Sequence, residues 1–184
     1  SIIVTNGNNV TLEDNGPVDL GAMNVATNLD VTANGTITQS GILTVGGAAT
    51  FRMRTALNQD VILNTEANDI AGPVTLESEL GGTVRDFLIR NDDPLVSVGG
   101  ITTTVGRDLF IWFPNAPIDL PAMVVNGDLT AIAGGGNVTD SGLVQVGVDA
   151  SFTTTAANDD INLGTLSVSG NVALTTNGAN GHAF

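Results

Sequence analysis

Short segments in which apolar residues alternate with mostly polar ones recur along the whole chain. Clear examples are residues 10–12, 29–31, 43–45, 61–63 and 74–76. Alternation with a period of two is typical of strands that bury one face. Turn clusters rich in Asn and Gly, such as residues 6–9 and 33–35, separate these segments. No stretch keeps the helical period over ten residues, so the pattern predicts an all-β protein.

The chain also repeats itself at long range. Residues 17–23, Pro-Val-Asp-Leu-Gly-Ala-Met, recur 100 positions later as Pro-Ile-Asp-Leu-Pro-Ala-Met at 117–123. Matched positions continue with small shifts over most of the sequence. The repeat predicts a first unit at residues 1–98 and a second, incomplete unit at 99–184. Because the same strand pattern runs through both units, we expect them to form one continuous domain.

Two all-β architectures are compatible with these short strands. A β-sandwich would also give alternating strands, but it does not explain a long unit that repeats at nearly constant length. A β-solenoid does, because each coil buries its apolar residues and stacks on a coil of similar shape. The aromatic content of 4% agrees with a narrow interior filled by small aliphatic residues. We predict a parallel β-helix, or β-solenoid, of about eight coils of roughly 20–25 residues, with the β-sandwich as the alternative.

The repeated segments resemble a known family. They are residues 37–51, 60–63 and 68–76 of the first unit, and residues 138–147 and 160–163 of the second. Their sequences resemble the repeats of filamentous-haemagglutinin-like surface proteins, which are very long bacterial exoproteins and adhesins. The resemblance implies a right-handed parallel β-helix shaft. It also implies an extracellular or cell-surface location on bacteria, and it carries no catalytic content.

The charge balance narrows the classes of partner. The 184 residues include 19 Asp and Glu against five Arg and no Lys, for a net charge of −14. Binding to nucleic acid or to anionic lipid headgroups needs a basic surface, so we expect neither partner. No apolar run reaches the roughly 18 residues that a membrane span needs, so we expect no membrane insertion. The chain has no Cys, which excludes disulfides and thiol chemistry.

The sequence offers little for catalysis. The single histidine, His182, lies close to the last residue and is expected to be solvated rather than part of a catalytic triad. Two adjacent carboxylate pairs, Asp92-Asp93 and Asp159-Asp160, have the residue types of a glycosidase site. Neighbours on a strand point to opposite faces, however, and both pairs lie in turn-like sequence. We therefore expect no enzyme activity.

Calcium is the one metal that the pattern favours. Turns rich in Asp and Asn supply the oxygen ligands that this ion prefers. The candidate ligands are Asp60, Asp69, Asp92, Asp93, Asp159 and Asp160. The alternative is that Asp and Asn occur there because they favour turns on backbone grounds. We expect no other cofactor.

One segment of the second unit departs from its counterpart. The 100-residue offset aligns residues 110–113, Phe-Ile-Trp-Phe, with residues 10–13, Val-Thr-Leu-Glu. The alignment predicts an inward pair, Phe110 and Trp112, and an outward pair, Ile111 and Phe113. The hypothesis is that residues 110–114 form a lateral or partner contact, and the alternative is that the outward pair is covered locally, for example by residues 85–95. Arg52 and Arg54 are expected to point outward and to pair with carboxylates.

Together these features predict a structural or adhesive section of a secreted bacterial β-solenoid that forms a surface layer or filament. Neither end of the sequence resembles a polar cap, so we expect the chain to continue or subunits to stack end to end. The expected partners are further copies, neighbouring repeats of a longer chain, or host and surface glycans. The alternatives are a carbohydrate-binding or carbohydrate-processing β-helix module, and a pilin-like filament subunit.

Overall fold

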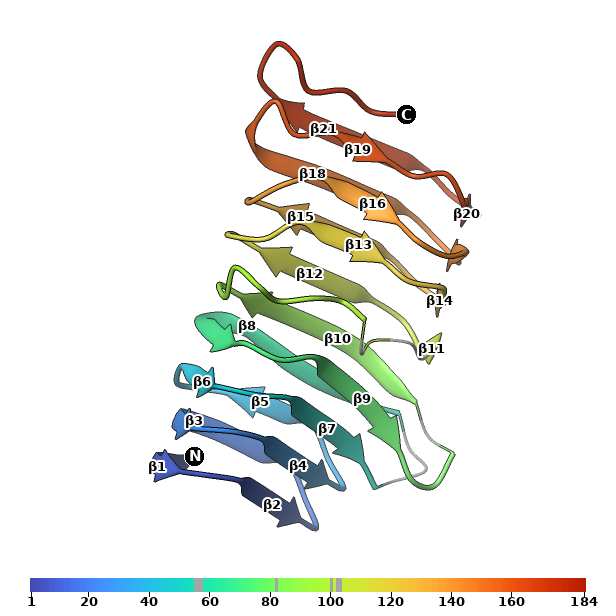
Figure 1. Ribbon diagram of the computed structural model, residues 1–184. Coiled ribbons are helices and arrows are strands. Elements are labelled where there is room, and N and C mark those ends of the chain that lie inside the picture. The colour runs from blue at the N-terminus through green and yellow to red at the C-terminus, as the bar shows by residue number, and fades with distance from the viewer. Residues whose placement is uncertain (55–57, 82, 100, 102–103) are drawn as a thin grey trace.

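The computed structural model describes residues 1–54, 58–81, 83–99, 101 and 104–184. Within these ranges the strands pair in parallel and stack along one axis as a β-solenoid of about 8 turns, and the described residues include no helix. Figure 1 shows the stack rising from the N-terminus to the C-terminus. The predicted solenoid is therefore confirmed, and the β-sandwich alternative is wrong, because sandwich sheets are built from antiparallel strands.

The strands form four sheets that run along the solenoid. Sheet A contains β1 (Ile2–Gly7), β3 (Val18–Val25), β5 (Ile37–Gln39), β6 (Leu43–Val45), β8 (Gln59–Ile70), β10 (Val84–Asn91), β12 (Leu109–Phe113), β15 (Leu129–Ala133), β18 (Ala150–Ala157) and β21 (Val172–Asn177). Sheet B contains β2 (Val10–Asp14), β4 (Leu29–Ala33), β7 (Ala49–Met53) and β9 (Val74–Ser78). Sheet C contains β11 (Thr104–Val105), β14 (Met123–Val125), β17 (Val144–Val146) and β20 (Leu166–Val168). Sheet D contains β13 (Ile118–Leu120), β16 (Val138–Asp140) and β19 (Ile161–Asn162).

Inward side chains of successive coils stack into columns. One column on sheet A runs from Ile111 through Ala131 to Phe152, and each of these residues is fully buried. Large and small side chains alternate along it, which fills the narrow interior. Burying a large apolar side chain contributes roughly 1.5–3 kcal/mol, so these columns hold the coils in register.

The structure corrects the predicted orientation of residues 110–113. Ile111 and Phe113 lie in the core with 0% and 1% of their surface exposed, whereas Phe110 and Trp112 point outward with intermediate exposure. The core position that Val10 occupies beside Leu29 is occupied in the second unit by Leu109 beside Leu129, not by Phe110.

One extra residue in a turn explains this error. The turn between β12 and Pro117 is one residue longer than the turn between β2 and Pro17. Before this turn the 100-residue offset is therefore one residue too large, and Val10 corresponds to Leu109. A slip of one residue along a strand exchanges its inward and outward faces. No local cover is needed over Ile111 and Phe113, because both belong to the core.

The two sequence units do not occupy the same faces of the solenoid. Val18 of the first motif pairs with Ile37 in sheet A, whereas Ile118 of the second motif pairs with Val138 in sheet D. Similarly, β2 belongs to sheet B and its counterpart β12 to sheet A. The repeat length is therefore not a whole number of coils, and the second unit is advanced by one face around the axis. Among the described residues, no helix is long and apolar enough to cross a membrane.

Candidate interaction surfaces

Outward side chains of sheet A form two rows along the axis. The first row contains Thr38, Ile62, Leu88, Phe110, Thr130, Ser151 and Ala173. The second contains Arg90, Trp112, Ile132, Thr153 and Thr175. The middle of both rows is apolar, and we define the apolar patch as Ile62, Leu88, Phe110, Trp112 and Ile132. All five side chains have intermediate exposure, and neighbours in a row are about 4.8 Å apart across the strands.

Arg90 covers part of the apolar patch. Its guanidinium carbon lies 4.4 Å from the centroid of the Trp112 ring, which is a cation–π contact. The same guanidinium donates two hydrogen bonds to Asp92, at 2.8 and 2.9 Å. The hydrogen bond to Asp92 raises the pKa of Arg90. Trp112 is the only tryptophan of the chain, so its fluorescence reports on this surface alone.

A column of aspartates borders the first row. Asp86, Asp108, Asp128 and Asp149 each precede the first core residue of a strand segment in successive coils. Each carboxylate accepts the backbone N–H of the residue one coil further on, for example from Asp128 to Asp108 at 3.0 Å and from Asp149 to Asp128 at 3.0 Å. This column was not predicted from the sequence. Its signal is an Asp that recurs every 20–22 residues directly before an inward apolar residue.

The end of the aspartate column lines a groove. Asp128, Asp149 and Asn171 form one wall, and Thr130, Ser151 and Ala173 of the first row lie beside them. We call this hollow the axial groove. Because Phe110 is the register neighbour of Thr130, the groove directly continues the apolar patch along the axis.

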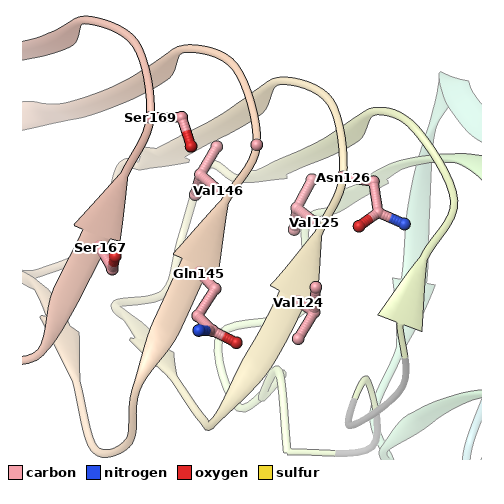
Figure 2. Close-up of a pocket in the computed structure, with 8 residues that line it drawn as sticks. Val124, Val125, Asn126, Gln145, Val146, Ser167 and Ser169 are labelled. Atoms are coloured by element: carbon pink, nitrogen blue, oxygen red, sulfur yellow. The ribbon is translucent and has the colours of Figure 1, made fainter.

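A second groove lies on sheet C. Figure 2 shows Val124, Gln145 and Ser167 side by side on β14, β17 and β20, with Asn126 and Ser169 at the neighbouring corner. Its lining residues carry no charge and no aromatic ring. A third hollow separates residues 96–99 from the outer face of sheet D. The third hollow combines Asp119 with apolar residues such as Val96 and Pro117, but its lining carries no aromatic ring.

The five arginines are all held in ion pairs. As predicted, Arg52 and Arg54 point away from the core, and they pair with Asp30, Glu77, Glu13 and Glu79. Arg85 binds Asp60, Arg90 binds Asp92, and Arg107 binds Asp86 and Asp108. Asp128 and Asp149 are not among these partners. The axial groove is therefore acidic, whereas the charges beside the apolar patch are partly neutralised.

The calcium candidates separate into different environments. Asp60 accepts hydrogen bonds from Arg85 at 2.8 and 2.5 Å, and Asp92 is bound by Arg90. The structure brings Asp69 and Asp93 together: partial burial, then the Asp93 carboxylate, raises the pKa of Asp69. Asp93 also accepts the N–H of Leu95 at 2.6 Å.

Asp159 and Asp160 lie in the turn after β18, far along the chain from the others. Asp160 accepts the backbone N–H of His182 at 2.8 Å. The His182 side chain is 61% exposed and stacks on Phe184. One carboxylate oxygen of Asp159 is buried without a hydrogen-bond partner. Over the ranges that the structure describes, no three His, Cys, Asp or Glu side chains converge as metal ligands would, and calcium binding stays a prediction.

A buried polar cluster lies where β5 and β6 pair with β8 in sheet A. This cluster was also not predicted from the sequence. Asn68 is fully buried; its amide donates to the side chain of Gln39 and to the carbonyls of Leu63 and Arg90, and its oxygen accepts the N–H of Leu43. In the next coil Asn91 exchanges two hydrogen bonds with the backbone of Ile70. These contacts satisfy the backbone where the chain bends, so the cluster has a structural role.

Comparison with known proteins supports the repeat. A family model described as repeats of unknown function, DUF5649, matches residues 7–77 and 106–161, which together are more than half of the chain. A search of the curated proteins and of the solved structures found no match. The two matched segments fall on the two repeated parts of the sequence. The chain therefore belongs to the DUF5649 repeat family.

Proposed function

We propose that the chain forms a structural section of a longer β-solenoid shaft or fibre, secreted and displayed on the bacterial surface, where it takes part in adhesion. The observation that carries the proposal is the composition of the two end coils. Their inward residues are apolar and half-exposed, so each end has the character of an interior surface. We assign no catalytic step to the chain.

The last coil shows this most clearly. Val172 and Leu174 on β21 continue the buried columns of Ala150 and Phe152, yet 47% and 40% of their surface is exposed. At the other end, Val10 and Leu12 on β2 are only partly buried, although they are the register partners of the buried Leu29 and Val31. A further coil stacked on either end would bury these side chains and gain the hydrophobic free energy that the inner coils have.

The backbone of the end coils supports the same interpretation. β1 and β21 are the outer strands of sheet A, and among the described residues each has one edge of N–H and C=O groups without a strand partner. An open edge is a template for pairing with another strand. A contact that joins the first coil to the last coil of another copy is head-to-tail and does not close, so it produces a filament.

Secretion and adhesion are supported by the sequence resemblance and by the charge of the surface. The repeats resemble those of filamentous-haemagglutinin-like exoproteins. The acidic surface, with a net charge of −14, opposes nonspecific association and suits a solvated fibre. The parallel strands remove the basis for a pilin-like β-sandwich subunit.

Electron microscopy and sedimentation of the purified chain test the stacking. At an ionic strength that screens the net charge, we expect filaments whose width is that of one solenoid. Leu174→Lys places a charge in the exposed column and should abolish them. Thr175→Lys is the matched control, because Thr175 points outward from the same strand. Filaments that Leu174→Lys leaves intact would overturn the proposed stacking between copies, whereas short rods at every concentration would assign the chain to one section of a longer shaft.

A further inference from the structure

The apolar patch is unusual among the outer surfaces of this solenoid. Towards the C-terminus, the same two rows of sheet A consist of Thr130, Ser151, Thr153 and Thr175 with the small Ala173. Phe110 and Trp112 are on adjacent outward positions of β12, with Leu88 and Ile132 beside them. The core does not need these rings, because the inward columns are filled by other residues. Their position on the outside therefore indicates contact with a ligand.

The patch and the axial groove form one continuous surface. The row that contains Leu88 and Phe110 passes directly into Thr130 and Ser151, which line the groove. The surface changes along the axis from aromatic side chains to hydroxyl and carboxylate groups. A ligand that fits it is extended, has apolar faces and has many hydroxyl groups along its edges.

These properties are those of a chain of sugar rings. The C–H groups on the face of a pyranose ring carry slight positive charge, which is attracted to the negative face of an aromatic ring. The hydroxyl groups on its rim donate hydrogen bonds, and Asp128 and Asp149 offer exposed acceptors. Each of these carboxylates uses one oxygen for a backbone N–H of the next coil, at 3.0 and 2.7 Å. The other oxygen is available to a ligand.

The carboxylates of the axial groove favour neutral ligands over anionic ones. In the part of the chain that the structure describes, no arginine pairs with Asp128 or Asp149, so the axial groove repels uronic acids and other anionic sugars. A second copy of the chain also has a net charge of −14 and meets the same repulsion. We infer that the outer face of sheet A binds a neutral oligosaccharide that runs along the solenoid axis from the apolar patch into the axial groove. This inference does not depend on end stacking.

Titration with defined hexasaccharides tests the inference. The probes are cellohexaose, laminarihexaose and maltohexaose, with hexagalacturonate as the anionic comparison. Because Trp112 is the only tryptophan, its fluorescence reports binding at the patch, and calorimetry gives the affinity independently. We expect at least one neutral hexamer to change the emission saturably. We expect hexagalacturonate to bind about tenfold more weakly or not at all.

Two variants locate the site. Phe110→Thr makes this position like its neighbour Thr130 and should weaken binding about tenfold through loss of ring contact. Val124→Thr makes a comparable outward change in the sheet C groove and should leave the affinity unchanged. Circular dichroism and urea unfolding confirm that both variants fold.

Four results would overturn the inference. They are no binding of any neutral hexamer at millimolar concentration, equal affinity for hexagalacturonate, neutral-sugar affinity unaffected by Phe110→Thr, and a dimer in sedimentation that Phe110→Thr dissociates. The last result would assign the face to a second copy of the chain.

Discussion

The guanidinium of Arg90 lies over the ring of Trp112, 4.4 Å from its centroid, on the outer face of the solenoid. The two residues are register partners on β10 and β12, so the contact crosses from one coil to the next. Asp92 holds the guanidinium in place from the other side through two hydrogen bonds. Contacts of this kind join neighbouring coils outside the core.

Arg90→Ala should destabilise the fold slightly and expose the tryptophan. Loss of a partly exposed cation–π contact is expected to lower the free energy of unfolding by about 0.5–1 kcal/mol. The emission of Trp112 should move to longer wavelength, because water replaces the arginine. Urea unfolding and a fluorescence spectrum measure both effects. Arg54→Ala beside sheet B is the control, and an identical spectrum for Arg90→Ala would show that the contact is not formed in solution.

The corrected register of β12 predicts that replacing two of its phenylalanines lowers the free energy of unfolding by different amounts. Phe113 is 1% exposed and Phe110 lies on the outer face. Phe113→Ala leaves a cavity in the core and should lower the free energy of unfolding by about 3–5 kcal/mol. Phe110→Ala should cost clearly less, about 1 kcal/mol, because only part of its ring is buried. Denaturant unfolding of the two variants measures the difference, and the reverse order would restore the orientation that the repeat alignment predicts.

Why the alignment failed at β12 is clear from the residues. Five consecutive apolar residues, 109–113, carry no alternation, so nothing within that segment marks its inward face. The alignment was anchored on Pro17 and Pro117, and the extra residue lies in the turn just before the second anchor. Turns have no period that would reveal an insertion. Strand pairing does reveal it, because Leu109 and Val10 hold equivalent places beside Leu129 and Leu29.

The general fold was predictable because most strands, unlike β12, do alternate between apolar and polar residues. Inward Val, Leu and Ile alternate with polar residues in most strands, and the motif at 17–23 recurs at 117–123. The shift of the second unit by one face was not predictable. It depends on the length of the segments around β10, where register partners such as Val61 and Phe87 are 26 residues apart, against 19 for Val10 and Leu29. The apolar patch follows from the same register and was therefore found only with the correct pairing.

Asn68 is expected to be among the least replaceable polar residues. It is fully buried and bonds to Gln39, Leu43, Leu63 and Arg90. Asn68→Ala leaves several buried partners unsatisfied and should lower the free energy of unfolding by about 3 kcal/mol, since each unsatisfied group costs about 1–3 kcal/mol. Urea unfolding measures the loss, and hydrogen exchange should localise it to β5, β6 and β8.

The exposed Asn126 provides the comparison for this variant. Asn126→Ala makes the same substitution at the corner that follows β14 and should have little effect. Equal effects of the two substitutions would show that burial of the Asn68 network does not contribute to stability.

Asp140 should make the stability of the fold depend on pH. Burial acts to raise the pKa of its carboxyl, but hydrogen bonds from the Thr165 hydroxyl and from the N–H groups of Thr165 and Gly164 outweigh burial and lower it. A lowered pKa in the folded state gives stability that is present above the ordinary value of about 3.9 and is lost as the pH falls through the folded value. Asp140→Asn should therefore cost about 1 kcal/mol at neutral pH and much less in acid, as measured by urea unfolding at several pH values.

Asp69 provides the opposite sign within the same chain. Although much of its side chain is exposed, partial desolvation and the nearby Asp93 raise its pKa. A raised pKa means that the folded state is favoured by protonation, so this stability is present in acid and is lost as the pH rises through the folded value. Asp69→Asn should therefore stabilise the fold at neutral pH and have no effect in acid. If Asp140→Asn and Asp69→Asn changed the free energy of unfolding in the same direction at neutral pH, the opposite pKa shifts assigned to the two carboxylates would be wrong.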